Sequence, residues 1–342
     1  MNRIQGLDSI RFICALFVLF GHLGVINKNT FYFLPTNISH YLSAAIGLIF
    51  NGPAAVVVFF VISGFCIHFS FVKTQTINIP KYYFRRLIRI GLPAITAAAF
   101  FIFFHNPKNV WTDTVLWSVT CEVIYYLLYP LLLVVRFHIG MLYMILISYV
   151  ISILVLLLNI DMVYAANNSY VALGKHTWII GLPCWLMGCY LAETYHRFKI
   201  LTTYNIWKIR ILIVFIVFLL RILKFHSTYI VASNAFSLNL FAVIVFFWLG
   251  FEIMYLSNKK LFKPLEWAGS WSYSLYLIHP LTISILGYAG IESLGIGTET
   301  DRIFHILSAF LLAYIFFILI ESPAHKLAIN ISNKRFINII GR

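Results

Sequence analysis

Two ionisable residues of different kinds lie in the first apolar stretch of the chain. The segment LDSIRFICALFVLFGHLG carries Arg11 near its start and His22 near its end. Eleven residue steps make about three helical turns, so in a helix the two side chains share one face, ~16 Å apart along the axis. Asp8 lies three residues before Arg11 and can pair with it. The segment therefore predicts a cation near one membrane surface and, on the same face, a titratable imidazole.

Each of these residues also has an ordinary explanation. Arg11 can be a flanking residue whose charged end reaches the membrane surface. His22 can be a histidine whose ring is satisfied by a neighbouring helix. Ionisable side chains inside membrane segments are costly and often functional, and the shared face of the two residues favours a functional role.

The composition indicates which elements must position these residues. Of the 342 residues 61% are hydrophobic and 11% charged, and the mean hydropathy is +0.90. This balance predicts an all-α, polytopic transmembrane helical bundle surrounded by membrane lipid. We expect a single domain over residues 1–342 with no appended soluble domain. About ten spans are predicted, near residues 10–26, 46–72, 90–105, 121–136, 139–159, 176–196, 208–224, 236–257, 269–288 and 302–321.

The distribution of positive charge predicts the orientation of these spans. With a cytoplasmic N-terminus, only six of the 25 Lys and Arg residues fall on the outer side. Those six are Lys28, Lys108, Lys175, Arg221, Lys224 and Arg302. Basic residues concentrate in cytoplasmic loops, so both termini are predicted to be cytoplasmic. The same bias explains the net charge of +14 without nucleic acid as a partner.

The cysteines and histidines show no metal-ligand spacing. All five cysteines fall in or beside apolar spans and are interpreted as small apolar filler. The histidines other than His22 and His279, among them His68 and His105, are interpreted as structural or interfacial. We therefore predict no metal and no permanently bound cofactor.

The Arg-x10-His pair is followed by further motifs in a fixed order. These are FFVISGF (59–65), RRLIRIGLP (85–93), WSVTCEVIYYLLYP (117–130), SYSLYLIHPL (272–281) and ESP (321–323). The set resembles the integral-membrane acyltransferase family 3, which includes polysaccharide and lipopolysaccharide O-acetyltransferases. The resemblance covers roughly residues 7–323. Val123 is a departure, since the family often has a polar or acidic residue after the glutamate.

The resemblance implies transfer of an acyl group, most simply acetyl, from acyl-CoA to a sugar hydroxyl. Arg86 and Arg89, spaced for one side of a helix start and flanked by Arg85, are expected to bind the phosphates of acyl-CoA. The alternative for these arginines is ordinary cytoplasmic charge. His22 is expected to act as general base, or as a nucleophile that carries the acyl group. Arg11 steadies the donor or, with Asp8, sets the tilt of the helix.

Four further residues complete the predicted site, and a fifth, Glu321, is assigned a structural role. Glu122 is expected to orient His22 or to bind acceptor hydroxyls, although a carboxylate is also favourable at a helix start. Trp117 and Ser118 are assigned to the acceptor, with an aromatic-belt residue as the alternative for Trp117. His279, beside Pro280, is assigned to the acceptor or to a kink with a locally satisfied ring. Glu321 is expected to end the last span and to pair with an inner arginine.

Two other classes of protein remain open at this stage. A transporter or flippase for a glycan or lipid-linked precursor would use a similar polar cavity without a thioester. A sensor or scaffold would need no His22. The family resemblance places the protein in a bacterial inner membrane, with a glycan or lipid-linked saccharide as acceptor. Longer members carry an extracytoplasmic hydrolase-like domain, which a separate partner protein would have to supply here.

Overall fold

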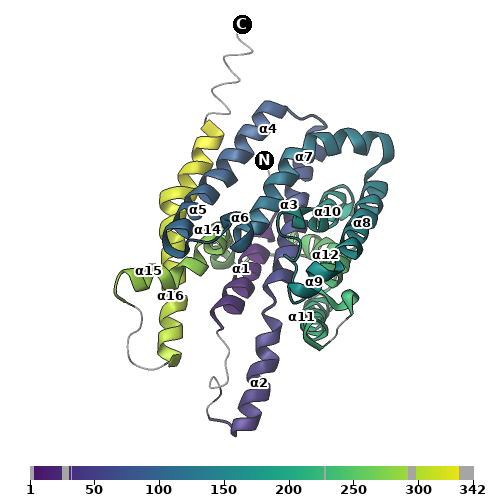
Figure 1. Cartoon of the computed structure of the whole chain (residues 1–342). Coiled ribbons are helices and arrows are strands. Elements are labelled where there is room, and N and C mark those ends of the chain that lie inside the picture. The colour runs from purple at the N-terminus through teal and green to yellow at the C-terminus, as the bar shows by residue number, and fades with distance from the viewer. Residues whose placement is uncertain (1–3, 25–30, 32, 227–228, 292–297, 331–342) are drawn as a thin grey trace. The chain divides into compact units, whose positions relative to one another are not determined.

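The chain folds into helices, as the composition predicts. The computed structural model describes residues 4–24, 31, 33–226, 229–291 and 298–330, and this part of the chain contains no β-strand (Figure 1). The all-α prediction is therefore confirmed for the described residues.

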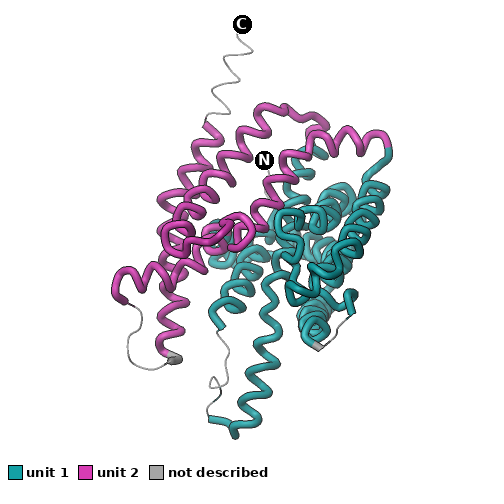
Figure 2. Tube along the Cα trace, viewed as in Figure 1, with its two compact units in different colours: residues 1–73, 139–272 teal, residues 74–138, 273–342 magenta. Residues whose placement is uncertain are grey.

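The helices form two compact units, and each unit combines two separate stretches of sequence (Figure 2). Unit 1 contains residues 1–73 and 139–272, and unit 2 contains residues 74–138 and 273–342. Each unit therefore joins an early part of the chain to a late part.

Unit 1 holds the first three helices and most of the helices from the middle of the chain. Its α-helices are α1 (Leu7–Leu23), α2 (Thr36–Ile49), α3 (Gly52–Thr74), α8 (Met141–Leu158), α9 (Ile160–Ala165), α10 (Thr177–Thr194), α11 (Thr203–His226), α12 (Asn234–Leu256) and α13 (Lys263–Gly269). Within this unit α10 packs against α8 and α12, and α11 packs against α12 and α2.

Helices α3 and α10 approach each other backbone to backbone. A Cβ atom added at Gly64 would lie 2.0 Å from the carbonyl oxygen of Trp185, and one added at Gly188 would lie 2.0 Å from that of Val61. The buried indole of Trp185 donates to the hydroxyl of Ser63 at 3.3 Å. Small residues such as Ser63 and Gly64 allow such close packing inside a membrane.

The first helix is docked at its start onto α13. The Glu266 carboxylate accepts hydrogen bonds from the amide of Ser9, at 3.0 Å, and from its hydroxyl. A Cβ atom at Gly269 would lie 2.1 Å from the carbonyl oxygen of Asp8. The amides of a first helical turn have no intrahelical partner, so Glu266 satisfies one of them.

Unit 2 contains two consecutive helical runs and the end of the chain. Its elements are α4 (Ile79–Arg86), the π-helical turn η1 (Leu87–Gly91), α5 (Leu92–His105), α6 (Val110–Asp113), α7 (Leu116–Ile139), α14 (Ser272–Ile278), the 3-10 turn η5 (His279–Leu281), α15 (Thr282–Tyr288), α16 (Thr298–Phe316) and the π-helical turn η6 (Phe317–Glu321). Tyrosine hydroxyls tie these elements together, since Tyr82 and Tyr83 on α4 donate to the carbonyls of residues 126 and 127 on α7.

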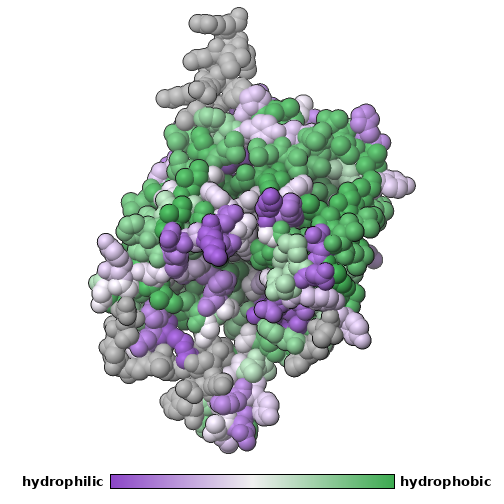
Figure 3. Space-filling model, in the orientation of Figure 1, coloured by the Kyte–Doolittle hydropathy of each residue, from purple (hydrophilic) through white to green (hydrophobic). Residues whose placement is uncertain are grey.

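Six helical segments of the described chain are long and apolar enough to cross a membrane. They are Thr36–Thr74, Ile79–His105, Leu116–Ile139, Met141–Leu158, Asn234–Leu256 and Thr300–Asn330. Apolar residues cover large areas of the visible surface (Figure 3), and α8 alone exposes Leu142, Tyr143, Leu146, Ile147, Val150, Ile151, Leu154, Leu157 and Leu158. The chain is therefore an integral membrane protein.

The other four predicted spans remain predictions, and one of them is not a continuous helix. The spans near 10–26, 176–196 and 208–224 correspond to α1, α10 and α11. The stretch 269–288 is not one helix but consists of α14, η5 and α15, with the break at His279–Pro280. Proline lacks an amide hydrogen and clashes with the preceding turn, which explains the break.

Candidate functional site

Helix α1 carries Arg11 and His22 on one unbroken run of α-helix. Arg11 is partly buried, and its guanidinium lies 3.3 Å from the Asp8 carboxylate, as the three-residue spacing predicts. The same guanidinium donates to the Sγ atom of Cys66 on α3, also at 3.3 Å. A cysteine interpreted as apolar filler thus contacts the charged group of the predicted site. Asp8, itself buried, and Cys66 fix the direction of Arg11.

His22 lies in the last turn of α1, close to the end of the helix. Gly24 adopts a left-handed conformation with φ 57° and its amide donates to the carbonyl of Phe20, which ends the helix at Leu23. The predicted span to residue 26 is therefore too long, and the imidazole is exposed rather than buried.

The three arginines of the predicted phosphate site lie on a continuous helical run, Ile79–His105. The prediction that they mark a helix start is wrong, because Arg85 and Arg86 end α4 and Arg89 lies inside the π-turn η1. Arg85 is exposed, whereas Arg86 and Arg89 are partly buried. The wider turn changes the angle between Arg86 and Arg89 from the value that an α-helix would give.

Glu122 and Arg86 are linked through one tyrosine. The hydroxyl of Tyr126 donates to the Glu122 carboxylate one turn earlier on α7. The guanidinium of Arg86 lies over the Tyr126 ring, 6.0 Å from its centre. Tyr82 donates to the carbonyl of Tyr126 at 3.1 Å, which fixes this part of α7 against α4. Tyr126 was not singled out from the sequence, although it lies four residues after a partly buried glutamate.

Ser118 is buried between α7 and α14. Its hydroxyl lies 2.8 Å from that of Tyr276 and donates to the carbonyl of Val115 at 3.2 Å. Tyr276 donates to the same carbonyl at 3.0 Å. These bonds connect two helices. Trp117, the preceding residue, is only partly buried.

His279 is fully buried at the break between α14 and η5. Its Nδ1 lies 2.9 Å from the carbonyl oxygen of Tyr276 and 3.2 Å from that of Leu275. Carbonyls only accept hydrogen bonds, so Nδ1 carries the hydrogen. Nδ1 is therefore satisfied locally at the helix break, and the assignment of His279 to the acceptor stays a prediction.

The predicted site residues divide between the two units. Arg11 and His22 belong to unit 1. The structure brings Arg86 and Glu122 together through Tyr126 in unit 2. The remaining predicted residues of unit 2 are Arg85, Arg89, Trp117, Ser118 and His279.

One contact between a buried histidine and a glutamate in unit 1 was missed. The Nε2 atom of His68 on α3 lies 2.8 Å from the carboxylate of Glu193 on α10, and the His68 side chain is fully buried. Both residues fall inside predicted spans, where ionisable side chains usually pair with one another. The presence of two ionisable residues inside predicted spans was therefore a sequence signal for this pair.

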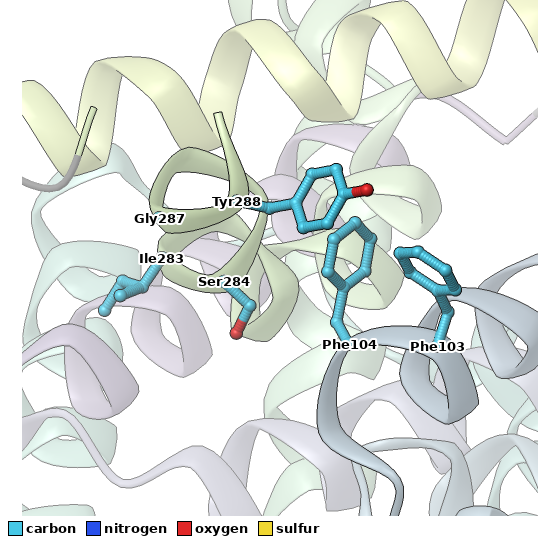
Figure 4. Close-up of a pocket in the computed structure, with 6 residues that line it drawn as sticks. All are labelled: Phe103, Phe104, Ile283, Ser284, Gly287 and Tyr288. Atoms are coloured by element: carbon cyan, nitrogen blue, oxygen red, sulfur yellow. The ribbon is translucent and has the colours of Figure 1, made fainter. Parts of the chain in front are cut away.

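A second contact that sequence reasoning missed lies in unit 2, beside a pocket of about 680 Å³. Figure 4 shows the rings of Phe103, Phe104 and Tyr288 close together, with the Ser284 side chain on the same short helix as Tyr288. The hydroxyl of Ser284 lies 2.6 Å from Nε2 of His105, the last residue of α5. Nothing in the spacing of these two residues, 179 positions apart, indicates the contact.

The fold and these residues define a class: an integral membrane protein built from helices, with an arginine and a histidine on its first helix and further arginines and a glutamate in a second helical unit. The chain belongs to the acyltransferase family 3, since the family model described as an acyltransferase domain matches residues 4–322. Comparisons with curated proteins and with solved structures found no significant match. The protein is therefore an acyltransferase of a membrane, and the resemblance deduced from the sequence motifs is confirmed.

Proposed function

We propose that the protein transfers an acyl group, most simply acetyl, from acyl-CoA to a hydroxyl of a cell-surface polysaccharide or lipid-linked sugar in a bacterial inner membrane. The observation that carries the proposal is the first helix, on which Arg11 is held by Asp8 and Cys66 and His22 lies in the last turn. The family match supports acyl transfer, and acyl-CoA is the donor that the basic residues fit.

His22 is the general base in this proposal. The acceptor hydroxyl attacks the thioester carbon while the imidazole takes its proton, and the C–S bond breaks. The CoA thiolate leaves and is protonated by the imidazolium, which gives free CoA and the sugar ester. The exposure of His22 suits contact with two substrates.

The arginines of unit 2 bind the donor. Arg86 and Arg89 contact the phosphates of acyl-CoA, which suit the planar fork of donors on a guanidinium, and Arg85 adds charge nearby. Glu122, Trp117 and the region around Ser118 and His279 bind the acceptor. An extracytoplasmic partner domain would complete transfer where the acceptor lies outside the membrane.

The test uses purified full-length protein in nanodiscs with radiolabelled acetyl-CoA and host glycan freed of its esters by mild alkali. We expect His22→Ala to reduce label transfer and CoA release about 10²- to 10⁴-fold, the range for a general base. His196→Ala is the matched control, because His196 is an exposed histidine at a helix end of the same unit. Full transfer by His22→Ala would refute the proposal and favour a carrier for the glycan.

A trapping experiment separates the two roles of His22. Direct transfer predicts no labelled protein when acetyl-CoA is supplied without acceptor. Label bound to His22 under that condition, identified by mass spectrometry, would instead indicate an acyl-imidazole intermediate.

A further inference from the structure

The helix that carries the donor-binding arginines contains a π-turn with a cause in the sequence. Pro93 follows the last residue of η1, Gly91, by two positions. Proline has no amide hydrogen, so the carbonyl of Arg89, four residues earlier, cannot form its α-helical bond. Helices are most often kinked at prolines and at π-turns. Such π-turns are frequent at functional sites.

The second π-turn of unit 2 repeats this pattern. Pro323 follows the last residue of η6, Glu321, by two positions, and the helix continues to Asn330. The prediction that Glu321 ends the last span is therefore wrong. Proline alone does not produce a π-turn, since Pro183 lies within the regular helix α10 of unit 1. A further contact must favour the wider turn at these two places.

Helix α14 provides that contact to both π-turns through adjacent residues. The hydroxyl of Tyr273 donates to the carbonyl of Ile90, inside η1, at 3.1 Å. The amide of Ser274, at 3.1 Å, and its hydroxyl both donate to the Glu321 carboxylate, the last residue of η6. Glu321 thus holds the first turn of α14, and α14 holds the residue next to Arg89.

We propose that Tyr273 and Glu321 are positioning residues for Arg89. Tyr273 keeps η1 in its wide form by occupying the Ile90 carbonyl, so the backbone of Arg89 presents its guanidinium to the donor phosphates. Glu321 acts one step further away, because it fixes Ser274 and with it the phenol of Tyr273. The proposal rests on the proposed donor role of Arg89 and concerns only how that role is achieved.

The test measures acetyl-CoA binding to full-length protein in nanodiscs. Tyr273→Phe removes one hydrogen bond, so we expect the dissociation constant to rise about three- to tenfold. The KM for acetyl-CoA rises in parallel, whereas kcat and the KM for the acceptor do not change. Glu321→Ala removes the acceptor of both Ser274 donors and should show the same split, and its result decides the matter if Tyr273→Phe does not fold.

A double variant and a matched control separate positioning from general weakening of the fold. In an Arg89→Ala background, Tyr273→Phe should cause no further loss of affinity, because its effect passes through Arg89. Tyr149→Phe removes a similar bond in unit 1, to the carbonyl of Asn239 at 2.9 Å, and should leave acetyl-CoA affinity unchanged.

Three outcomes would overturn the proposal. Unchanged affinity in Tyr273→Phe refutes it directly, and an equal loss in the presence and absence of Arg89 shows that the effect is not transmitted through that residue. Unchanged affinity in Arg89→Ala removes the donor role itself, and with it both the positioning proposal and the donor part of the proposed function. If Arg89→Ala loses acetyl-CoA affinity and Tyr273→Phe does not, the positioning proposal is refuted but the donor role of Arg89 remains.

Discussion

The two units bring their helices together in different ways. In unit 1, α3 and α10 meet at Gly64 and Gly188, where the absence of a side chain lets the backbones touch. In unit 2, η1 and η6 are wide π-turns within two long helical runs. Tyr273 and Ser274 of α14 contact these turns, at the Ile90 carbonyl and at the Glu321 carboxylate. The contact between α3 and α10 in unit 1 leaves no room for added atoms, whereas the two π-turns of unit 2 are contacted through individual hydrogen bonds. Unit 1 should therefore be sensitive to added bulk and unit 2 to the loss of single polar atoms.

The largest effect is expected at the contact between α3 and α10. Gly188→Ala places a methyl group 2.0 Å from the Val61 carbonyl, and overpacking of this kind costs about 1–3 kcal/mol or more. We expect a clearly lower melting temperature in nanodiscs. Gly91→Ala is the control, because Gly91 is helical and a Cβ atom there meets nothing within 4 Å. Equal stability of Gly188→Ala and wild type would show that unit 1 is not close-packed at this point.

An intermediate effect, with opposite signs for stability and binding, is expected from Pro93→Ala. The alanine restores an amide hydrogen for the Arg89 carbonyl and favours a regular α-helix, which can stabilise the helix by up to about 3 kcal/mol. The turn then narrows and Arg89 rotates, so acetyl-CoA affinity falls several-fold while the melting temperature stays level or rises. Ligand titration and thermal unfolding of the same sample measure both. A fall in both acetyl-CoA affinity and melting temperature would contradict this prediction, because it would mean that Pro93 stabilises the native helix.

The smallest effect is expected from Ser274→Ala. The variant removes the hydroxyl donor to Glu321 but keeps the amide donor, so we expect a loss of about 1 kcal/mol, the net contribution of one hydrogen bond. Ser148→Ala is the control, because its buried hydroxyl donates only to a carbonyl of its own helix, that of Ile145. A loss no greater than that of the control would remove the distinction between the units.

The sequence predicted most of the helices because apolar runs and charge bias act over whole segments. Asp8–Arg11 pairing and close packing at Gly64 were also predictable, since each depends on local spacing or on one residue type. The helix boundaries were less accurate. The left-handed Gly24 ends α1 before the apolar pattern ends, and η1 continues a helix where a start was expected.

The rest of the candidate site depends on contacts between distant segments. The i,i+3 argument for Arg86 and Arg89 assumed α-helical geometry, but Arg89 lies in a π-turn whose Ile90 carbonyl accepts a hydrogen bond from Tyr273, 183 residues further along the chain. The same holds for Glu321, whose serine partner lies on another helix, and for the pair His68–Glu193. Periodicity identifies the face of a helix but not the partner that the face will meet.

The interleaving of the two units has a consequence for biosynthesis. Helices α1 to α3 leave the ribosome before the segment 74–138, which belongs to unit 2. At ~5–20 residues per second those 65 residues take about 3–13 s to synthesise, and only then do the unit 1 partners α8 to α13 begin to follow. The Gly64 face of α3 and the start of α1 must wait for α10 and α13 during that time, so nascent chains should depend on lipid or an insertion factor to cover them. A chain stopped after residue 138 would contain about a third of unit 1 and about half of unit 2, and would complete neither.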